Sequence, residues 1–324
     1  MQLQSKVSIR KYSPGDEQRW NDFVAKAGNA SFLFDRRYMD YHSHRFIDHS
    51  LMIFVNDNLR ALFVANEDGN KIHSHGGLTY GGLVVEHGSR MEEVLRYFFH
   101  ILKYYSKDFK FIVYKCFPWE FMRYRSQEDL YAMFLLNAEL IGRQASSVYQ
   151  RNAGIPYRRS KKETTSKPAT QFSIIKSTDP STFWSEVLAP NLQERFGTSP
   201  VHAAAEMKLL MDLFPSNIHL FQIHDNELLA GAVIFEMDDI VHTQYLSTTE
   251  NGRKVDALDI LIDHLVMNVF KTKSRFSFGT SNGHHGRTLT KGLIAWKEGF
   301  GARTSVHDIY LISTDQYHEL ADYE

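Results

Sequence analysis

The chain has 324 residues, 43% of them hydrophobic and 23% charged, a composition typical of a globular protein and long enough for two domains. Its formal net charge of -1 gives no general electrostatic reason to bind nucleic acid or an anionic membrane. A single cysteine, Cys116, excludes an internal disulfide and a zinc site built from cysteines. Because Cys116 ends an apolar run, we expect a packed thiol there and not a nucleophile.

The N-terminal segment Met1–Arg10 lacks the apolar core of a signal peptide. No apolar run in the sequence approaches the length of a membrane-spanning helix. We therefore expect a cytoplasmic protein that makes no integral membrane contact.

The first half of the chain predicts strands and helices in alternation. In chain order they are a strand at 7–10, a helix through Trp20 and Val24, a hairpin of 51–55 and 59–65, a helix at 91–105, a strand at 109–116, a helix at 129–141 and a strand at 146–149.

A glycine-rich run at residues 72–85 interrupts this half. Four glycines flank Leu78-Thr79-Tyr80, and glycine lets a ligand or another backbone approach closely. Two interpretations stay open, a bulged strand packed on a neighbour and a ligand contact. In the second, Tyr80 would bind the acceptor together with His73 and His75.

Residues 151–170 break the pattern with Gly154, Pro156 and the basic run Arg158–Lys162. We expect the inter-domain connection here, which divides the chain into a first domain at 1–150, a basic linker at 151–170 and a second domain at 171–324. The basic run is interpreted as solvated linker. The alternatives are a phosphate-contacting strip and a nucleic-acid-binding module, whose binding would collapse with salt.

The second half repeats the coarse order of the first, which suggests a duplicated α/β unit. Its expected elements are a strand at 171–175, helices at 180–194 and 202–213, a hairpin of 218–224 and 228–236, a strand at 240–246, a loop at 247–254, a helix at 256–270, a strand at 275–278, a loop at 279–287 and a helix through Leu293 and Trp296.

Both loops lie between a strand and a helix N-terminus, where an anion or a developing negative charge is stabilised. We expect them to contact donor or substrate, with basic side chains as the anion contacts and surface charge as the alternative. The candidates are Asn251, Gly252, Arg253 and Lys254 in the first loop, and Ser281, Asn282, His284, His285 and Arg287 in the second.

Catalytic candidates lie on the strand at 240–246 and in the second loop. His242 and Gln244 alternate onto one face, with Tyr245 on the other. His242 would accept a proton, Gln244 would orient the acceptor and Tyr245 would protonate the leaving group, the alternatives being a structural histidine and a core tyrosine. We expect His284 or His285 to touch substrate. Adjacent histidines without acidic residues at ligand spacing do not indicate a metal site.

The order of these motifs resembles the GNAT acyltransferase superfamily, and more closely its FemAB-like branch, which has two GNAT-type domains in tandem. The likeness covers most of the chain and is carried by residues 245–254, Ala257-Leu258-Asp259, 278–281, 297–301 and, in the first half, 78–82 and 126–131. It implies an α/β (α+β) fold of two tandem GNAT-like domains. Each would be a mixed, mostly antiparallel sheet flanked by helices and splayed open where donor and acceptor meet.

The resemblance implies an acyl or aminoacyl transferase that acts on an amine or hydroxyl of a bacterial cell-envelope glycan or peptide precursor. The donor would be acyl-CoA or aminoacyl-tRNA, with no metal. GNAT proteins bind pyrophosphate with the pattern Gln/Arg-x-x-Gly-x-Gly/Ala. When this pattern is aligned on Arg253, the chain has Asp256 in place of the first glycine and Leu258 in place of the last small residue. A carboxylate there would cap the helix and repel a pyrophosphate, which leaves aminoacyl-tRNA or a donor bound elsewhere. The alternative is a catalytically weak GNAT-fold protein that binds a ligand.

Overall fold

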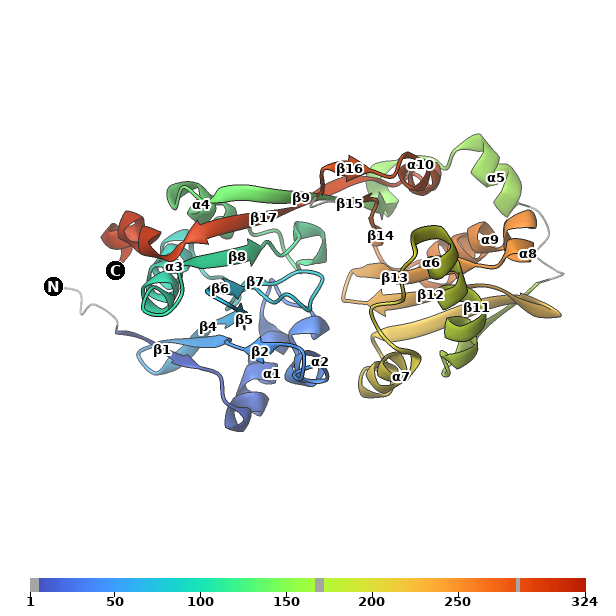
Figure 1. Cartoon of the computed structure of the whole chain (residues 1–324). Coiled ribbons are helices and arrows are strands. Elements are labelled where there is room, and N and C mark those ends of the chain that lie inside the picture. The colour runs from blue at the N-terminus through green and yellow to red at the C-terminus, as the bar shows by residue number, and fades with distance from the viewer. Residues whose placement is uncertain (1–5, 167–171, 284–285) are drawn as a thin grey trace. The chain divides into compact units, whose positions relative to one another are not determined.

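The computed structural model describes residues 6–166, 172–283 and 286–324 (Figure 1). These residues form two compact units. Unit 1 takes those within Met1–Gln144, His284–Thr288 and Val306–Glu324, and unit 2 takes those within Ala145–Gly283 and Leu289–Ser305.

Two long strands carry the chain from one unit into the other, β9 (Glu139–Gln150) and β17 (Arg303–Ser313). The later residues of β17 pair antiparallel with β8 (Phe111–Lys115), from Ile309↔Lys115 to Ser313↔Phe111. The C-terminal residues therefore join unit 1, whereas the sequence analysis assigned the whole of 171–324 to the second domain. Pairing between strands so far apart in sequence leaves no local pattern by which to predict it.

The described part of the expected linker is folded into unit 2. Gly154, at φ 67°, ends the short helix η4 (Arg151–Ala153), and α5 (Arg159–Thr165) follows. The Lys161 ammonium on α5 forms an ion pair with the carboxylate of Asp259 on α9 (Ala257–His264). This basic run is thus partly a packed helix and not only a solvated connection.

Unit 1 contains an antiparallel sheet in the order β1-β3-β4-β7. The strands are β1 (Val7–Lys11), β3 (Leu51–Val55), β4 (Asn58–Val64) and β7 (Gly82–Val85). The predicted β3–β4 hairpin is confirmed. Its two turn residues, Asn56 and Asp57, both have positive φ, as a tight hairpin turn with the twist of the sheet requires.

A second set of strands in unit 1 has the order β17-β8-β6-β5-β2, in which β6 and β8 are parallel. Its short members are β2 (Ile47–Asp48), β5 (Asn66–Asp68) and β6 (Lys71–His73). The predicted helix α3 (Met91–Tyr105) is confirmed and packs Leu95, Phe98 and Leu102 into the core. The other helices are η1 (Pro14–Asp16), α1 (Glu17–Lys26), η2 (Phe32–Phe34), α2 (Arg36–Asp40), η3 (Trp119–Phe121), α4 (Glu128–Leu135) and η9 (Thr314–Tyr323).

Unit 2 has strand order β10-β11-β12-β13-β14-β9, antiparallel except for the parallel pair β13 and β14. The strands are β10 (Ser173–Ser177), β11 (Ile218–Asp225), β12 (Glu227–Glu236), β13 (Ile240–Thr248) and β14 (Arg275–Thr280). The predicted β11–β12 hairpin is confirmed, with Asn226 at φ 57° in its turn. Two short strands follow β14, β15 (Asn282–Gly283) and β16 (Thr288–Leu289).

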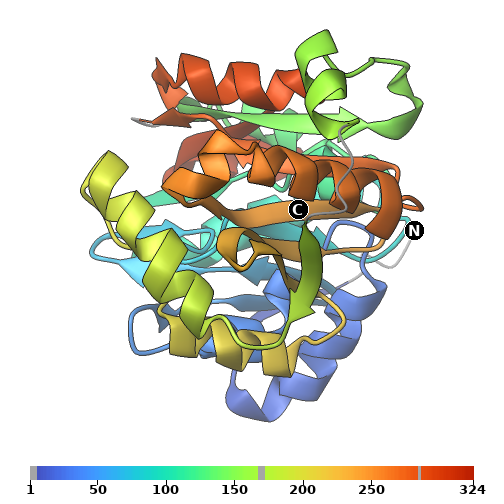
Figure 2. The ribbon, with the colours of Figure 1, turned by 90° about the vertical axis from the view of Figure 1, so that its right-hand side faces the viewer.

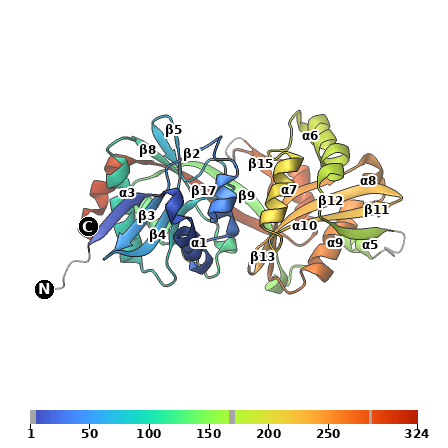
Figure 3. The same cartoon turned by 90° about the horizontal axis from the view of Figure 1, so that it is seen from below.

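Helices cover both faces of the unit 2 sheet (Figures 2 and 3). On one face lie η6 (Phe183–Leu188), α6 (Ala189–Phe196) and α7 (Ala204–Leu213); α9 lies on the other, with α8 (Glu250–Lys254), η7 (Leu265–Val269) and α10 (Lys291–Gly299). The core beneath α9 joins Leu261 and Leu265 to Phe276, Phe278 and Phe300. The predicted fold class, mixed and mostly antiparallel sheets flanked by helices in each half, is confirmed.

The ion pair between Lys161 and Asp259 predicts that α5 stabilises unit 2. Both side chains are little exposed, 13% and 12%, so Lys161→Met leaves a buried carboxylate unpaired and lowers the free energy of unfolding by about 3–5 kcal/mol in urea titrations. The matched control is Arg159→Met on the same helix, whose ion pair with Glu163 is exposed and contributes about 0–1 kcal/mol. Equal effects of the two substitutions would contradict the packed position of α5.

Candidate functional site

The parallel strands β13 and β14 separate in the middle of unit 2. Their register runs from Ile240↔Arg275 to His242↔Ser277, after which β14 continues its pairing with β9 across a bulge between Ser277 and Thr280. Gly279 forms this bulge at φ 68°, and a Cβ on it would lie 3.2 Å from Cε1 of His242. The chain therefore uses glycine where β14 turns away from β13.

A second bulge, in β13, determines which side chains share a face. Thr243 pairs with Ile234 and Tyr245 with Val233, so Gln244 is an extra residue on this strand. One extra residue reverses the alternation beyond it. Tyr245 therefore lies on the same face as His242, and the prediction that it lies on the opposite face from His242 was wrong.

His242 begins a short chain of polar groups where the strands part. Its Nδ1 lies 3.1 Å from Oγ of Ser277. That hydroxyl accepts a hydrogen bond from the Gly279 amide at 3.3 Å and lies 3.5 Å from Oγ of Ser146. His242 is half-buried. It thus lies in the last pair before the two strands part, and its role as a proton acceptor stays a prediction.

Tyr245 is held by the segment that precedes α7. Its hydroxyl lies 2.7 Å from Nδ1 of His202 and accepts a hydrogen bond from the His202 amide at 3.2 Å. The indole of Trp184 in turn donates to the His202 carbonyl at 2.8 Å. Burial raises the pKa of Tyr245, so the phenol keeps its proton at neutral pH. This state suits a proton donor.

Lys297 on α10 is a candidate site residue that was not predicted from the sequence. Its side chain is almost fully buried, and Nζ donates to the carbonyls of Gly279 at 2.9 Å and Thr280 at 2.7 Å. Burial lowers the pKa of Lys297 to about 7. The available signal was its spacing, three residues after Ile294 and three before the core residue Phe300, which places a lysine on a buried helix face.

Lys115, a half-buried lysine in unit 1, can be compared with Lys297. Nζ of Lys115 donates to three carbonyls, those of His75, Gly76 and Leu78, at 2.9–3.4 Å. These bonds use all three N–H groups of an ammonium and hold the glycine-rich run in place, and burial also lowers the pKa of Lys115, to about 8. Lys297 donates only two such hydrogen bonds. A neutral amine has two N–H groups, so both would be used and the nitrogen lone pair would remain available to accept a proton.

The first predicted loop, residues 247–254, is not a loop. β13 continues to Thr248, and α8 follows with Thr249 as its cap, whose Oγ1 accepts from the Gly252 amide at 3.0 Å. The Arg253 amide donates to the Thr249 carbonyl at 3.0 Å, so both amides are engaged within the helix. A Cβ on Gly252 would lie 2.3 Å from the Leu229 carbonyl oxygen, so this glycine allows α8 to pack on β12.

The side chains around α8 also bond within the protein. Asn251 donates to Glu227 at 2.8 Å, and Lys254 pairs with Glu250 at 3.0 Å. Arg253 donates to the Thr248 carbonyl at 3.3 Å. The helix thus replaces the anion-binding loop that we expected, because strand β13 extends further than its apolar pattern indicated.

Asp256 does not cap α9 through its side chain as predicted. It adopts left-handed backbone at φ 56°, and its side chain makes no capping hydrogen bond. Asp259, one turn further, accepts from the Trp296 indole at 2.7 Å as well as pairing with Lys161. This carboxylate therefore ties α5, α9 and α10 together.

The second predicted loop places polar groups beside the end of β14. The Ser281 amide donates to the Ala145 carbonyl at 3.2 Å, and Asn282 Oδ1 accepts from the Ala145 amide at 2.9 Å. Within the described residues, Ser281 Oγ, Asn282 Nδ2 and Ser147 Oγ are buried and have no hydrogen-bond partner. Buried groups of this kind are expected to meet a ligand or water. Arg287 is exposed, and His284 and His285 lie outside the described residues.

Tyr80 is a buried core residue, and its predicted contact with the acceptor stays a prediction. Its ring is 2% exposed and packs on Phe34, Phe117 and Phe121, and its hydroxyl donates to Ser31 at 3.3 Å. Burial raises the pKa of Tyr80 far above its ordinary value. The flanking glycines serve the turn that brings this side chain inward.

Over the ranges that the structure describes, no cluster of three or more His, Cys, Asp or Glu side chains is arranged to hold a metal ion. None of the helices in those ranges combines the length and apolarity needed to span a bilayer.

Comparison with known proteins defines the fold. No family model and no curated protein matches the sequence. Among solved structures, FemX superposes with a TM-score of 0.66 at 12% identity, over 97% of this chain and 100% of FemX. A tandem GNAT protein from the clavulanic acid biosynthesis pathway gives a TM-score of 0.53 at 10% identity, over 95% of this chain and 99% of that one.

A third structure is the C-terminal domain of an Agrobacterium fabrum protein assigned as a lysylphosphatidylglycerol synthetase. It gives a TM-score of 0.56 at 10% identity, over 95% of both chains. The protein is thus an α/β chain with two GNAT-type domains in tandem. FemX shares this fold over nearly the whole chain.

The fit of α8 against β12 can be tested with two glycine substitutions. Gly252→Ala brings a methyl group against the Leu229 carbonyl, and we expect it to lower the free energy of unfolding by about 2 kcal/mol or more. Gly292→Ala, at an open position of α10, is the control and raises stability by about 0.5–1 kcal/mol through helix propensity. A neutral Gly252→Ala in urea unfolding would show that α8 lies elsewhere.

Proposed function

We propose that this protein is an acyl or aminoacyl transferase whose reaction centre lies where β13 and β14 part in unit 2. The observation that carries the proposal is the buried Lys297 amine, held by the carbonyls of Gly279 and Thr280 at the end of β14. A buried amine with a pKa of about 7 is matched to proton transfer at neutral pH.

In the proposed reaction the acceptor's amine or hydroxyl attacks the acyl carbon of the donor. The neutral Lys297 amine takes the proton that the nucleophile loses, and the resulting ammonium returns it to the leaving oxygen or sulfur. The buried Ser281 hydroxyl and Asn282 amide donate to the oxyanion of the tetrahedral intermediate. His242 and Tyr245 share the β13 face and would orient the acceptor, with Tyr245 as a further proton donor.

The choice of donor follows from α8. The amides of Gly252 and Arg253 are engaged within the helix, and the acidic residue Asp256 follows α8 in the chain, which disfavours a pyrophosphate at this position. We therefore place aminoacyl-tRNA ahead of acyl-CoA. For the acceptor we propose a cell-envelope glycan or peptide precursor in the cytoplasm. This agrees with the FemAB-like motifs and with a neighbour assigned as a lysylphosphatidylglycerol synthetase.

Because α8 stands where a donor-binding loop was expected, it also favours a second candidate, a GNAT-fold protein that binds a ligand without transferring an acyl group. Transfer of isotope-labelled acyl groups from acetyl-CoA, longer acyl-CoAs and aminoacyl-tRNAs separates the two. A ligand that binds without any transfer would support the second candidate and overturn the first.

If Lys297 is the base, transfer requires its neutral form. We expect kcat/KM to rise with pH through about 7 and to fall by about 10²–10⁴-fold in Lys297→Met and Lys297→Arg. The arginine variant keeps a positive charge but cannot release a proton at these pH values. Lys271→Met, an exposed lysine of the same unit, is the control and retains full activity.

The folded state of each variant is checked by circular dichroism, and added methylamine is expected to restore part of the activity of Lys297→Ala. Full activity of Lys297→Arg would show that a cation and not a base is needed at this position.

A further inference from the structure

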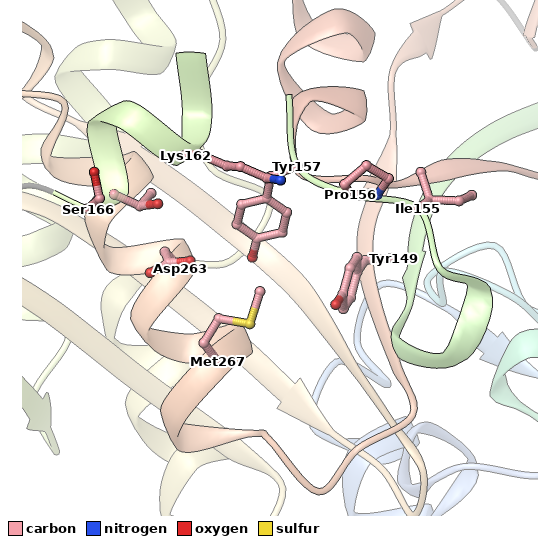
Figure 4. Close-up of a pocket in the computed structure, with 9 residues that line it drawn as sticks. Tyr149, Ile155, Pro156, Tyr157, Lys162, Ser166, Asp263 and Met267 are labelled. Carbon is pink, nitrogen blue, oxygen red and sulfur yellow. The ribbon is translucent and has the colours of Figure 1, made fainter. Parts of the chain in front are cut away.

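A separate cavity in unit 2 has no part in the proposed reaction. It has a volume of about 400 Å³, within the range of ligand pockets, and lies between the end of β9, the segment 155–157, α5, α9 and η7. Its wall consists of Tyr149, Ile155, Pro156, Tyr157, Lys162, Thr165, Ser166, Asp263 and Met267 (Figure 4).

The polar centre of this cavity is a tyrosine beside a carboxylate. The side chain of Tyr157 is 9% exposed, and its hydroxyl has no hydrogen-bond partner that meets normal geometry within the described part of the chain. Figure 4 shows this hydroxyl directed into the space bounded by Asp263, Met267 and Tyr149. Burial, with the nearby Asp263 carboxylate, raises the pKa of Tyr157. The phenol therefore remains uncharged and offers one donor and an acceptor oxygen.

Asp263 is the acidic group of the cavity, whose wall also includes Lys162. It is half-buried on α9, and burial raises the pKa of its carboxyl group. Among the residues that the structure describes, no lysine, arginine or histidine lies at ion-pair distance from it. A half-buried carboxylate without a cation is costly unless a ligand supplies the charge.

The rest of the wall favours an organic cation over a bare metal ion. Ile155, Pro156 and Met267 offer apolar surface beside the carboxylate, which suits the carbon chain of an organic cation. A metal ion would need several oxygen ligands at short range, whereas one carboxylate is present. An anion would meet Lys162 only at the exposed rim and the Asp263 carboxylate inside.

We propose that this cavity binds an organic ammonium ion with a short aliphatic body, its charged head between Asp263 and Tyr157 and its carbon chain against Met267 and Pro156. Amino-acid side chains that end in an amine and short diamines belong to this class. The site is independent of the strand divergence that carries the proposed reaction.

The test compares three probes of equal carbon length by calorimetry or NMR titration of the full chain: cadaverine, 1,5-pentanediol and glutarate. We expect saturable binding of cadaverine only. Asp263→Asn weakens it by about 10–100-fold, because a charge-assisted hydrogen bond is lost, and Tyr157→Phe by about fivefold. Asp225→Asn, on an exposed hairpin turn of the same unit, leaves binding unchanged.

Thermal unfolding of each variant gives a second readout. Tyr157→Phe removes a buried hydroxyl whose hydrogen-bonding neighbour is the Asp263 carboxylate, outside normal hydrogen-bond geometry among the described residues, so the variant is expected to fold about as stably as the parent chain. Its weaker binding then reports on the site itself. Three results would each overturn the proposal: no saturable cadaverine binding, equal binding by Asp263→Asn, or tighter binding of glutarate than of cadaverine.

Discussion

The divergence of β13 and β14 after the pair His242 and Ser277 is the constraint on which the rest of unit 2 depends. Two parallel strands that stop pairing expose polar backbone, and something must satisfy it. Here β14 pairs with β9 on its other side, Gly279 absorbs the bend, and Lys297 takes up the two carbonyls at the strand end. Lys297 therefore both donates hydrogen bonds to the carbonyls at the strand end and has a pKa lowered by burial.

Lys115 and Lys297 are both removed from water and held by backbone carbonyls. Lys115 gives all its donors to backbone carbonyls and holds the glycine-rich run of unit 1 in place. Lys297 donates to two carbonyls, and burial lowers its pKa to about 7, which is why we propose it as the proton acceptor.

Patterns within one element were enough to predict much of the fold. The periodic apolar face of α3 and the polar turns of both hairpins are local, and so are the motifs that resemble the FemAB-like branch. The bulge at Gln244, the helix α8 and the return of β17 to unit 1 depend on partners distant in sequence. The burial of Tyr80 was not predicted for the same reason, since glycines flanking an aromatic residue do not show which way the turn faces.

The proposed proton transfer requires Lys297 to be a neutral amine, and not an ammonium ion, at neutral pH. The most direct measurement is its pKa by NMR of ¹³C-methylated lysines, with Lys297→Arg to assign the signal. We expect the Lys297 amine to titrate with a pKa of about 7, well below the ordinary lysine value of 10.5. A pKa at or above that ordinary value would show a permanent cation and contradict the proposed proton transfer.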